Sequence, residues 1–437
     1  MIENKKSINI ITLGCSKNTV DSEHLMAQMS AAGYEVRFDS DEFDSEVVVI
    51  NTCGFIGDAK EESVEMILSA VEAKEEGLID QLFVVGCLSE RYADELREEI
   101  PDVDQYFGVR GWEALVERLG GTYDKALETE RELSTPDHYA YLKISEGCNW
   151  MCGYCAIPLI RGRYISVPEE QLIEEAEGLA SKGVRELIVI AQDTTFYGMD
   201  LYGERRLASL LRQLCRIEGI EWVRLHYAYP TDFPRDVIEV MAEEPKICKY
   251  IDIPFQHIAD NQLTAMKRRH TKAQAVELIE ELRAKIPDIV LRTTMMVGHP
   301  GESEADYEEL VAFVREVGFE RLGVFTYSEE EGTASARLAD DVPQEVKEQR
   351  AEQLMLIQSE ISLQKNLKRV GEVMRVIVDR EEGDFYVARS QYDSVDVDQE
   401  ILIQSDGEEL EVGEFYDVEI TSAEDFDLYA VISQSEI

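Results

Sequence analysis

The chain has 437 residues, 44% of them hydrophobic, so it can fill several cores and is not mainly disordered. Asp and Glu number 90 against 43 Lys and Arg, which gives a formal net charge of −47. This acidity excludes binding to phosphate backbones through bulk positive charge and favours basic partners. At about 150 residues per domain, we expect about three domains.

The sequence carries no mark of export or membrane insertion. Its first residues lack the apolar stretch of a signal peptide, and no run approaches about 18 apolar residues, so we expect a cytoplasmic protein with no membrane contact. Cysteines in that compartment rarely form disulfides. The positions of the eight cysteines must therefore decide whether they are metal ligands, nucleophiles or core residues.

The N-terminal third alternates short apolar runs with helical patterns, which predicts a parallel sheet with helices on its faces. We place this domain at residues 5–122, followed by a loosely patterned linker around residues 120–137. The predicted strands are 7–13, 46–52 and 82–86, and the predicted helices are 18–32, 58–76 and 88–98.

The middle of the chain, residues 134–370, repeats this alternation and predicts a full or partial (β/α) barrel. A long amphipathic helix at about 344–369 closes it. The predicted strands are 139–144, 185–191, 222–227, 249–253, 289–297 and 320–326, with helices at 169–182, 204–217, 234–243, 272–285 and 304–316.

The tail, residues 371–437, changes to an alternation of period two. Segments such as VMRVIVD, DFYVARS and EILIQ are separated by glycine and acidic residues. This pattern predicts a small all-β barrel.

Cys148, Cys152 and Cys155 form a C-x3-C-x2-C motif directly after the first predicted strand of the middle domain. Catalytic groups of such barrels lie in the loops at the carboxyl ends of the strands. Three neighbouring thiolates suit a soft metal or an iron–sulfur cluster, and no fourth cysteine or histidine follows nearby. A [4Fe–4S] cluster would then keep one iron open. The alternatives are a zinc ion with a remote fourth ligand, or three core cysteines.

Cys15, Cys53 and Cys87 each directly follow one predicted strand of the first domain. The carboxyl ends of parallel strands share one edge of a sheet, so these residues are expected to meet. We predict a second cluster there, again with an open iron, although any one of the three alone would be interpreted as a core thiol. Cys215 and Cys248 are predicted to be core residues.

The C-x3-C-x2-C spacing with an aromatic residue, Tyr154, before the last cysteine resembles the radical S-adenosylmethionine (SAM) superfamily. In that superfamily the open iron binds SAM, and reductive cleavage of its sulfonium gives a 5′-deoxyadenosyl radical. The cofactors carry the chemistry, and the protein positions them.

Two three-cysteine sites followed by a terminal β-barrel resemble the methylthiotransferases over essentially the whole chain. The resemblance implies an α/β architecture: a flavodoxin-like N-terminal domain, a partial (β/α) radical SAM barrel and a small C-terminal TRAM barrel. It implies that SAM, an electron donor and two [4Fe–4S] clusters take part. The auxiliary cluster would lie on Cys15, Cys53 and Cys87, and the radical SAM cluster on Cys148, Cys152 and Cys155.

Further contacts to SAM are expected at the carboxyl ends of the barrel strands, where glycines would permit close approach of the backbone. An ordinary strand-to-helix turn is the alternative at these positions. His226 and His257 also follow strands, and we interpret them as core or supporting residues rather than cavity residues. The four candidates for SAM contact are Tyr154, Gln192, Gly298 and Gly301.

The segments YAYLKISEGC, VIAQDTTFYG and RLHYAYP resemble one branch of the methylthiotransferases. That branch modifies the β-carbon of an aspartate in small-subunit ribosomal protein twelve, giving 3-methylthioaspartate. The chain departs from the branch at His299, where an aromatic residue is usual. It also departs at residues 427–430, which read DLYA where Asp-Leu-Trp-Gly is typical.

The charge of the tail also bears on the substrate. Residues 373–437 carry 3 basic and 19 acidic side chains, and no Lys or Arg follows Arg389. A TRAM domain that binds tRNA is expected to be basic, so direct RNA binding is not expected here, and a basic ribosomal protein is the expected partner. General acidity is another explanation, because residues 1–133 also carry 30 acidic against 12 basic side chains. The rival hypotheses are a tRNA adenosine methylthiotransferase and a non-enzymatic iron–sulfur protein.

Overall fold

The computed structural model describes residues 6–40, 43–404, 407 and 409–433, so the outer limits of the predicted domains, residues 5 and 437, lie outside the described residues. The chain divides into two compact units, each described by itself below. Across the described ranges we find no helix with the length and apolar character needed to span a membrane. Unit 1 comprises Met1–Thr135, Tyr141–Asn149 and Cys155–Leu179, and unit 2 comprises Pro136–Ala140, Trp150–Tyr154 and Ala180–Ile437.

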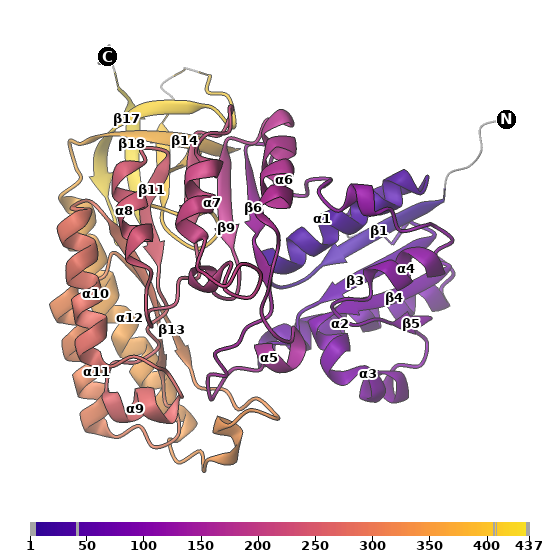
Figure 1. Ribbon diagram of the computed structural model, residues 1–437, viewed down its shortest axis with the longest axis horizontal. Helices are drawn as coiled ribbons and strands as arrows, with labels where there is room; N and C mark the ends of the chain where they lie inside the picture. The colour runs from indigo at the N-terminus through magenta and orange to yellow at the C-terminus, as the bar shows by residue number, and fades with distance from the viewer. Residues whose placement is uncertain (1–5, 41–42, 405–406, 408, 434–437) are drawn as a thin grey trace. The chain divides into compact units, whose positions relative to one another are not determined.

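Unit 1 is built on a five-stranded sheet with the order β2-β1-β3-β4-β5 (Figure 1). All its strand pairs are parallel. This order is that of the flavodoxin-like doubly wound sheet, so the expected fold is confirmed. The elements are β1 Ser7–Thr12, α1 Ser16–Ala31, β2 Glu35–Phe38, β3 Val47–Thr52, α2 Gly57–Glu75, β4 Gln81–Gly86, α3 Cys87–Glu99, β5 Gln105–Tyr106 and α4 Trp112–Arg118.

Helices cover both faces of this sheet because its central strands are apolar on both sides. All six residues of β3 are buried. Side chains of α1 and α4 pack on one face, and those of α2 and α3 pack on the other. The two short edge strands, β2 and β5, were not predicted from the sequence.

The stretch predicted as a loose linker is anchored by a buried charge. The Arg131 side chain is fully buried, and its guanidinium contacts the carboxylates of Glu23, in α1, and Glu175, in α6 (Glu169–Ser181). A guanidinium satisfied by two buried carboxylates holds an irregular segment in place without a strand or a helix. The remaining elements of unit 1 include β7 Ser145–Glu146, α5 Ile157–Ile160, β8 Ile165–Ser166 and α6 Glu169–Ser181.

Unit 2 contains an α/β sheet with the strand order β13-β12-β11-β10-β9-β6. The pairs from β9 to β13 are parallel, as expected for a partial (β/α) barrel. Its strands are β6 Tyr139–Lys143, β9 Glu186–Ile190, β10 Trp222–Leu225, β11 Ile247–Asp252, β12 Val290–Val297 and β13 Arg321–Thr326. Its helices are α7 Leu207–Leu214, α8 Arg235–Glu243, α9 Asp260–Ala265, α10 Lys272–Lys285, α11 Glu304–Val317 and α12 Gln344–Leu367.

The tail of unit 2 forms a closed barrel with the strand order β14-β15-β16-β18-β17, as the period-two pattern predicted. Alternate residues of these strands fill its interior, including Val376, Ile403 and Ile420. The barrel strands are β14 Val373–Glu382, β15 Phe385–Ser390, β16 Glu400–Gln404, β17 Phe415–Ala423 and β18 Asp427–Ile432.

A buried ion cluster joins the β-barrel to the α/β sheet inside unit 2. Glu186, at the start of β9, is fully buried and contacts the guanidinium groups of Arg224 and Arg389. Burial alone would raise the pKa of Glu186, but the two guanidinium groups lower it below its usual value. Arg389 also contacts Asp379, which accepts a hydrogen bond from His138.

We expect Glu186→Gln to destabilise the protein by about 3–5 kcal/mol, because two buried guanidinium groups lose their shared carboxylate. The measurement is thermal unfolding of the purified full-length chain. Glu382→Gln is the matched control, since this side chain is 65% exposed in its pair with Arg380. Equal melting temperatures for the two variants would contradict the stabilising role of Glu186.

Candidate functional site

The three cysteines of the first domain lie at neighbouring strand ends of unit 1. Cys15 follows β1, Cys53 follows β3 and Cys87 follows β4. The strand order reverses between β1 and β3, which is where doubly wound sheets open a crevice at their carboxyl ends. Cys15 is the N-cap residue of α1, and Cys87 is the first residue of α3. The positive ends of two helices therefore lie where two thiolates would form.

Backbone contacts show how closely these loops approach. A Cβ atom on Gly14 would lie 2.7 Å from Cys53 Cβ, and one on Gly54 would lie 2.7 Å from the backbone of Leu88. The structure thus brings the three predicted cysteine loops together. Burial raises the pKa of Cys87 to about 12 and also raises the pKa of Cys53, so ligation would have to displace a proton from each thiol.

Two polar residues that were not predicted from the sequence, Asn18 and Arg161, lie beside these cysteines. Asn18 is fully buried, and its Oδ1 lies 3.9 Å from Cys87 Sγ. Its amide donates to the carbonyls of Leu13 and Thr52, at the ends of β1 and β3. Arg161 donates to the same Asn18 Oδ1 at 2.5 Å. The side chain of Asn18 is therefore held in one orientation beside the cysteine.

Arg161 comes from a different part of the chain, six residues after Cys155. It is 2% exposed and contacts the carboxylates of Asp21 and Glu146. Its neighbour α5 packs against the first domain: Ala156 and Ile160 form a buried cluster with Cys87 and Val109. Within unit 1, the segment that follows the C-x3-C-x2-C motif thus forms part of the wall around Cys87.

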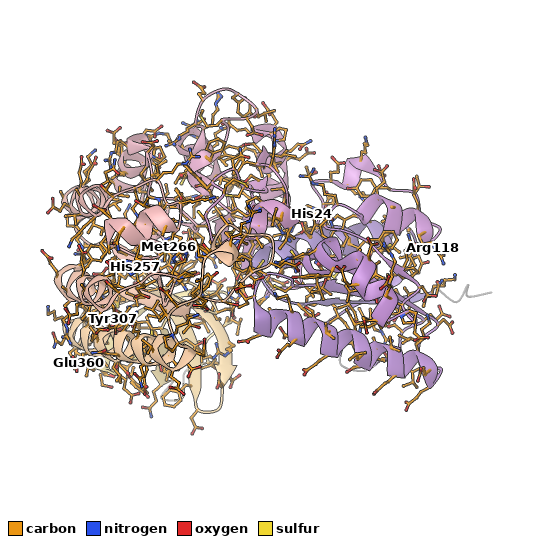
Figure 2. The ribbon with its side chains drawn as sticks, turned by 90° about the horizontal axis from the view of Figure 1, so that it is seen from below. His24, Arg118, His257, Met266, Tyr307 and Glu360 are labelled. Carbon is orange, nitrogen blue, oxygen red and sulfur yellow. The ribbon has the colours of Figure 1, made fainter. Side chains whose placement is uncertain are left out.

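The motif loop itself is held by backbone hydrogen bonds. In unit 1 the Cys148 amide donates to the Gly162 carbonyl at 3.1 Å. In unit 2 the Gly153 amide donates to the carbonyl of Met266, which is labelled in Figure 2, at 2.8 Å. The Gly153 carbonyl accepts from the Ser335 amide at 2.7 Å. The three cysteines of the motif are each partly exposed, as accessible ligands require.

His299, which the sequence analysis singled out, is connected to this loop. Its ring is fully buried and lies 2.8 Å from Ser335 Oγ and 3.2 Å from Gln262 Oε1. Ser335 in turn contacts Gly153 through the backbone. His299 is therefore linked to the motif through Ser335, by hydrogen bonds that a phenyl ring could not make.

The four candidates for SAM contact all lie in unit 2. The Tyr154 hydroxyl is 3.4 Å from Arg268 Nη1, and Gln192 directly precedes the buried Asp193. Gly298 has φ +74°, and a Cβ there would lie 2.2 Å from Lys347 Cγ, so packing against α12 already explains this glycine. Gly301 has φ +81°, and its amide donates to Asp341 at 2.7 Å. These contacts fit the turn interpretation of both glycines and leave their role toward SAM a prediction.

The remaining residues of interest are buried as expected. His226 donates to or accepts from Ser394 Oγ at 2.8 Å, and His257 lies 3.6 Å from Glu302 with no exposed surface. Cys215 and Cys248 are 8% and 1% exposed.

The donor chemistry of both cysteine sets fits an iron–sulfur cluster. Within the described ranges, no three His, Cys, Asp or Glu side chains stand in a ready geometry for a single metal ion. Each set offers three thiols, and three thiolates suit a cubane cluster with one open iron better than a closed four-ligand zinc site.

Comparison with known proteins decides the family. Three family models match along the chain: "Uncharacterized protein family UPF0004" at residues 7–108, "Radical SAM superfamily" at 142–314 and "TRAM domain" at 370–432. The chain is 55% identical to the ribosomal protein uS12 methylthiotransferase RimO of Bacteroides thetaiotaomicron, over 98% of both chains. It is 54% identical to RimO of Phocaeicola vulgatus, over 98% of this chain and 99% of that one. This chain belongs to the RimO family of methylthiotransferases.

RimO proteins are radical SAM enzymes, and the fold agrees. The radical SAM methyltransferase TsrM from Kitasatospora setae superposes with a TM-score of 0.56, covering 73% of each chain at 14% identity. At that identity the likeness concerns the fold alone. Membership of the RimO family implies SAM and two [4Fe–4S] clusters as cofactors, and it confirms the methylthiotransferase resemblance drawn from the six cysteines.

Proposed function

We propose that this protein transfers a methylthio group to the β-carbon of an aspartate in ribosomal protein uS12, giving 3-methylthioaspartate. The observation that carries the proposal is the pair of three-cysteine sets on a chain that shares 55% identity with a RimO protein over nearly its full length. A C–H bond of the aspartate is replaced by a C–S bond. One SAM molecule would supply the methyl group, and a second, cleaved with an electron from an external donor, would take up the hydrogen atom as 5′-deoxyadenosine. The auxiliary site would supply the sulfur.

We assign the radical SAM cluster to Cys148, Cys152 and Cys155, and the auxiliary cluster to the three cysteines at the strand ends of unit 1. The clusters, when bound, supply reductive cleavage of SAM and the sulfur to be transferred. The protein holds the thiols, excludes water and orients the reactants. Tyr154, Gln192, Gly298 and Gly301 are the proposed contacts to SAM.

The charges of the TRAM barrel favour a basic protein rather than RNA as the partner. Its three cations are all paired with carboxylates: Arg375 with Glu221, Arg380 with Glu400, and Arg389 with Glu186. No barrel cation within the described ranges is left to neutralise a phosphate, which RNA binding would require. The many remaining acidic side chains favour a basic ribosomal protein, encountered in the cytoplasm.

The experiment is mass spectrometry on cells with and without this gene. Tryptic peptides of uS12 and digested tRNA nucleosides are prepared from the same cultures. We expect the methylthio group to disappear from the aspartate peptide alone. Loss from adenosine alone would establish a tRNA methylthiotransferase, and loss from neither would favour a non-enzymatic iron–sulfur protein.

A further inference from the structure

Two side chains of unit 2 lie directly against the sulfur of Cys152. The Tyr229 hydroxyl is 3.5 Å from Cys152 Sγ, and Arg268 Nη1 is 3.8 Å from it. Both distances are in the range of hydrogen bonds to sulfur. The same guanidinium nitrogen lies 3.4 Å from the Tyr154 hydroxyl, so Cys152 and Tyr154 share one cation.

Arg268 differs from the other buried arginines of this protein. Arg131, Arg224 and Arg389 each contact at least one carboxylate. Arg268 is 7% exposed, yet among the described residues no carboxylate lies within ion-pair distance of it, and its Nε has no hydrogen-bond acceptor. Its other contacts are the Pro254 carbonyl and the face of the Tyr229 ring, 4.2 Å from the centroid.

A buried cation without a counter-anion is costly, so this arrangement points to a negative charge that arrives with a ligand. The negative group expected beside Cys152 is a thiolate-ligated iron–sulfur cluster. Reduction adds one more negative charge to such a cluster. A guanidinium and an O–H donor at the ligating sulfur therefore stabilise the reduced state of the cluster more than the oxidised state.

Tyr229 is fixed so that it can serve this purpose. Its ring stacks on Trp150 with a centroid separation of 4.2 Å and an interplanar angle of 8°. Trp150 in turn donates from its indole nitrogen to the buried carboxylate of Asp193 at 2.5 Å. These contacts hold the Tyr229 hydroxyl beside Cys152 Sγ, where it can donate a hydrogen bond to the sulfur.

We propose that Arg268, oriented by Tyr229, is a positioning residue that serves as the counter-cation of the radical SAM cluster and raises its reduction potential. This inference rests on the proposed function, because it requires a cluster on Cys148, Cys152 and Cys155. It assigns a role to a residue that lies outside the cysteine motif by more than 100 positions.

The test is a redox titration followed by electron paramagnetic resonance. The parent protein is the full chain with Cys15, Cys53 and Cys87 replaced by alanine, so that the signal comes from the radical SAM cluster alone. In this parent we expect Arg268→Gln to lower the ratio of reduced to oxidised cluster about tenfold at fixed potential, which corresponds to about 59 mV for one electron. Arg268→Lys should recover part of the shift.

Arg269→Gln is the matched control. It removes the same charge one residue away, from an exposed side chain whose nearest aromatic contact is the Trp150 ring at 5.6 Å. We expect the reduction potential of the cluster in this variant to equal that in the parent protein. Tyr229→Phe keeps the ring stack and loses only the hydroxyl, and it should shift the potential in the same direction as Arg268→Gln, but less.

An unshifted potential in Arg268→Gln, or equal shifts in Arg268→Gln and Arg269→Gln, would overturn the inference. Should Arg268→Gln fail to fold, Arg268→Lys and Tyr229→Phe decide the matter, and parental potentials in both would overturn it. A parent without any cluster signal would overturn the cluster assignment of the proposed function as well, so the two failures are distinguishable.

Discussion

Replacing Cys152 by alanine is expected to abolish the formation of 5′-deoxyadenosine from SAM. A [4Fe–4S] cluster held by only two of its three thiolates loses its protein anchor, and without the cluster no electron reaches the sulfonium. The measurement is chromatography of the products after incubation of the reconstituted enzyme with SAM and a chemical reductant. The iron content should fall by about four atoms per chain in the same samples.

Cys215→Ala is the control for this experiment. It makes the same substitution at a thiol that is 8% exposed and caps the end of α7, away from the motif. Production of 5′-deoxyadenosine should continue in this variant. If Cys152→Ala also continued to produce it, the assignment of the radical SAM cluster to this motif would be wrong.

Replacing Cys53 by alanine is expected to separate the two activities, methylthio transfer and cleavage of SAM. Methylthio transfer to the aspartate should be lost, because we assign the sulfur to be transferred to the site that includes Cys53. Formation of 5′-deoxyadenosine should survive at least in part, since the C-x3-C-x2-C motif is intact. Peptide mass spectrometry and nucleoside chromatography on the same reaction give both quantities.

The two cysteine variants together test whether one site cleaves SAM and the other supplies the sulfur. If Cys53→Ala lost 5′-deoxyadenosine as completely as Cys152→Ala, the auxiliary cysteines would have a structural role. Cys53 is buried and packs against Gly14, so the iron content and the thermal stability of each variant must accompany the assay.

The sequence predicted the strand–helix alternation, the closed tail barrel and the convergence of the first three cysteines. These predictions succeeded because they rest on local periodicity and on one topological rule: parallel strands end at a common edge. Cys15, Cys53 and Cys87 could be grouped without knowing any side-chain orientation, since each lies within three residues of the end of a strand.

Arg161, Asn18 and Arg268 could not be found in this way. Each is polar in a segment where a polar residue would normally face solvent, and only the tertiary structure shows it buried beside a cysteine. Gly298 gives the reverse case. A glycine is needed at this position because Lys347, in α12, packs against it. No local sequence pattern could reveal this contact with a distant helix.

The short helix α5 has a consequence for how such enzymes can diverge. The family model that covers residues 7–108 contains Cys15, Cys53 and Cys87, but not Arg161, Ala156 or Ile160, which complete the surroundings of Cys87. A graft of residues 7–108 onto a foreign barrel would therefore carry the ligands without their enclosure. The two modules are expected to be inherited and exchanged as a pair, because the sequence module ends before its own site is complete.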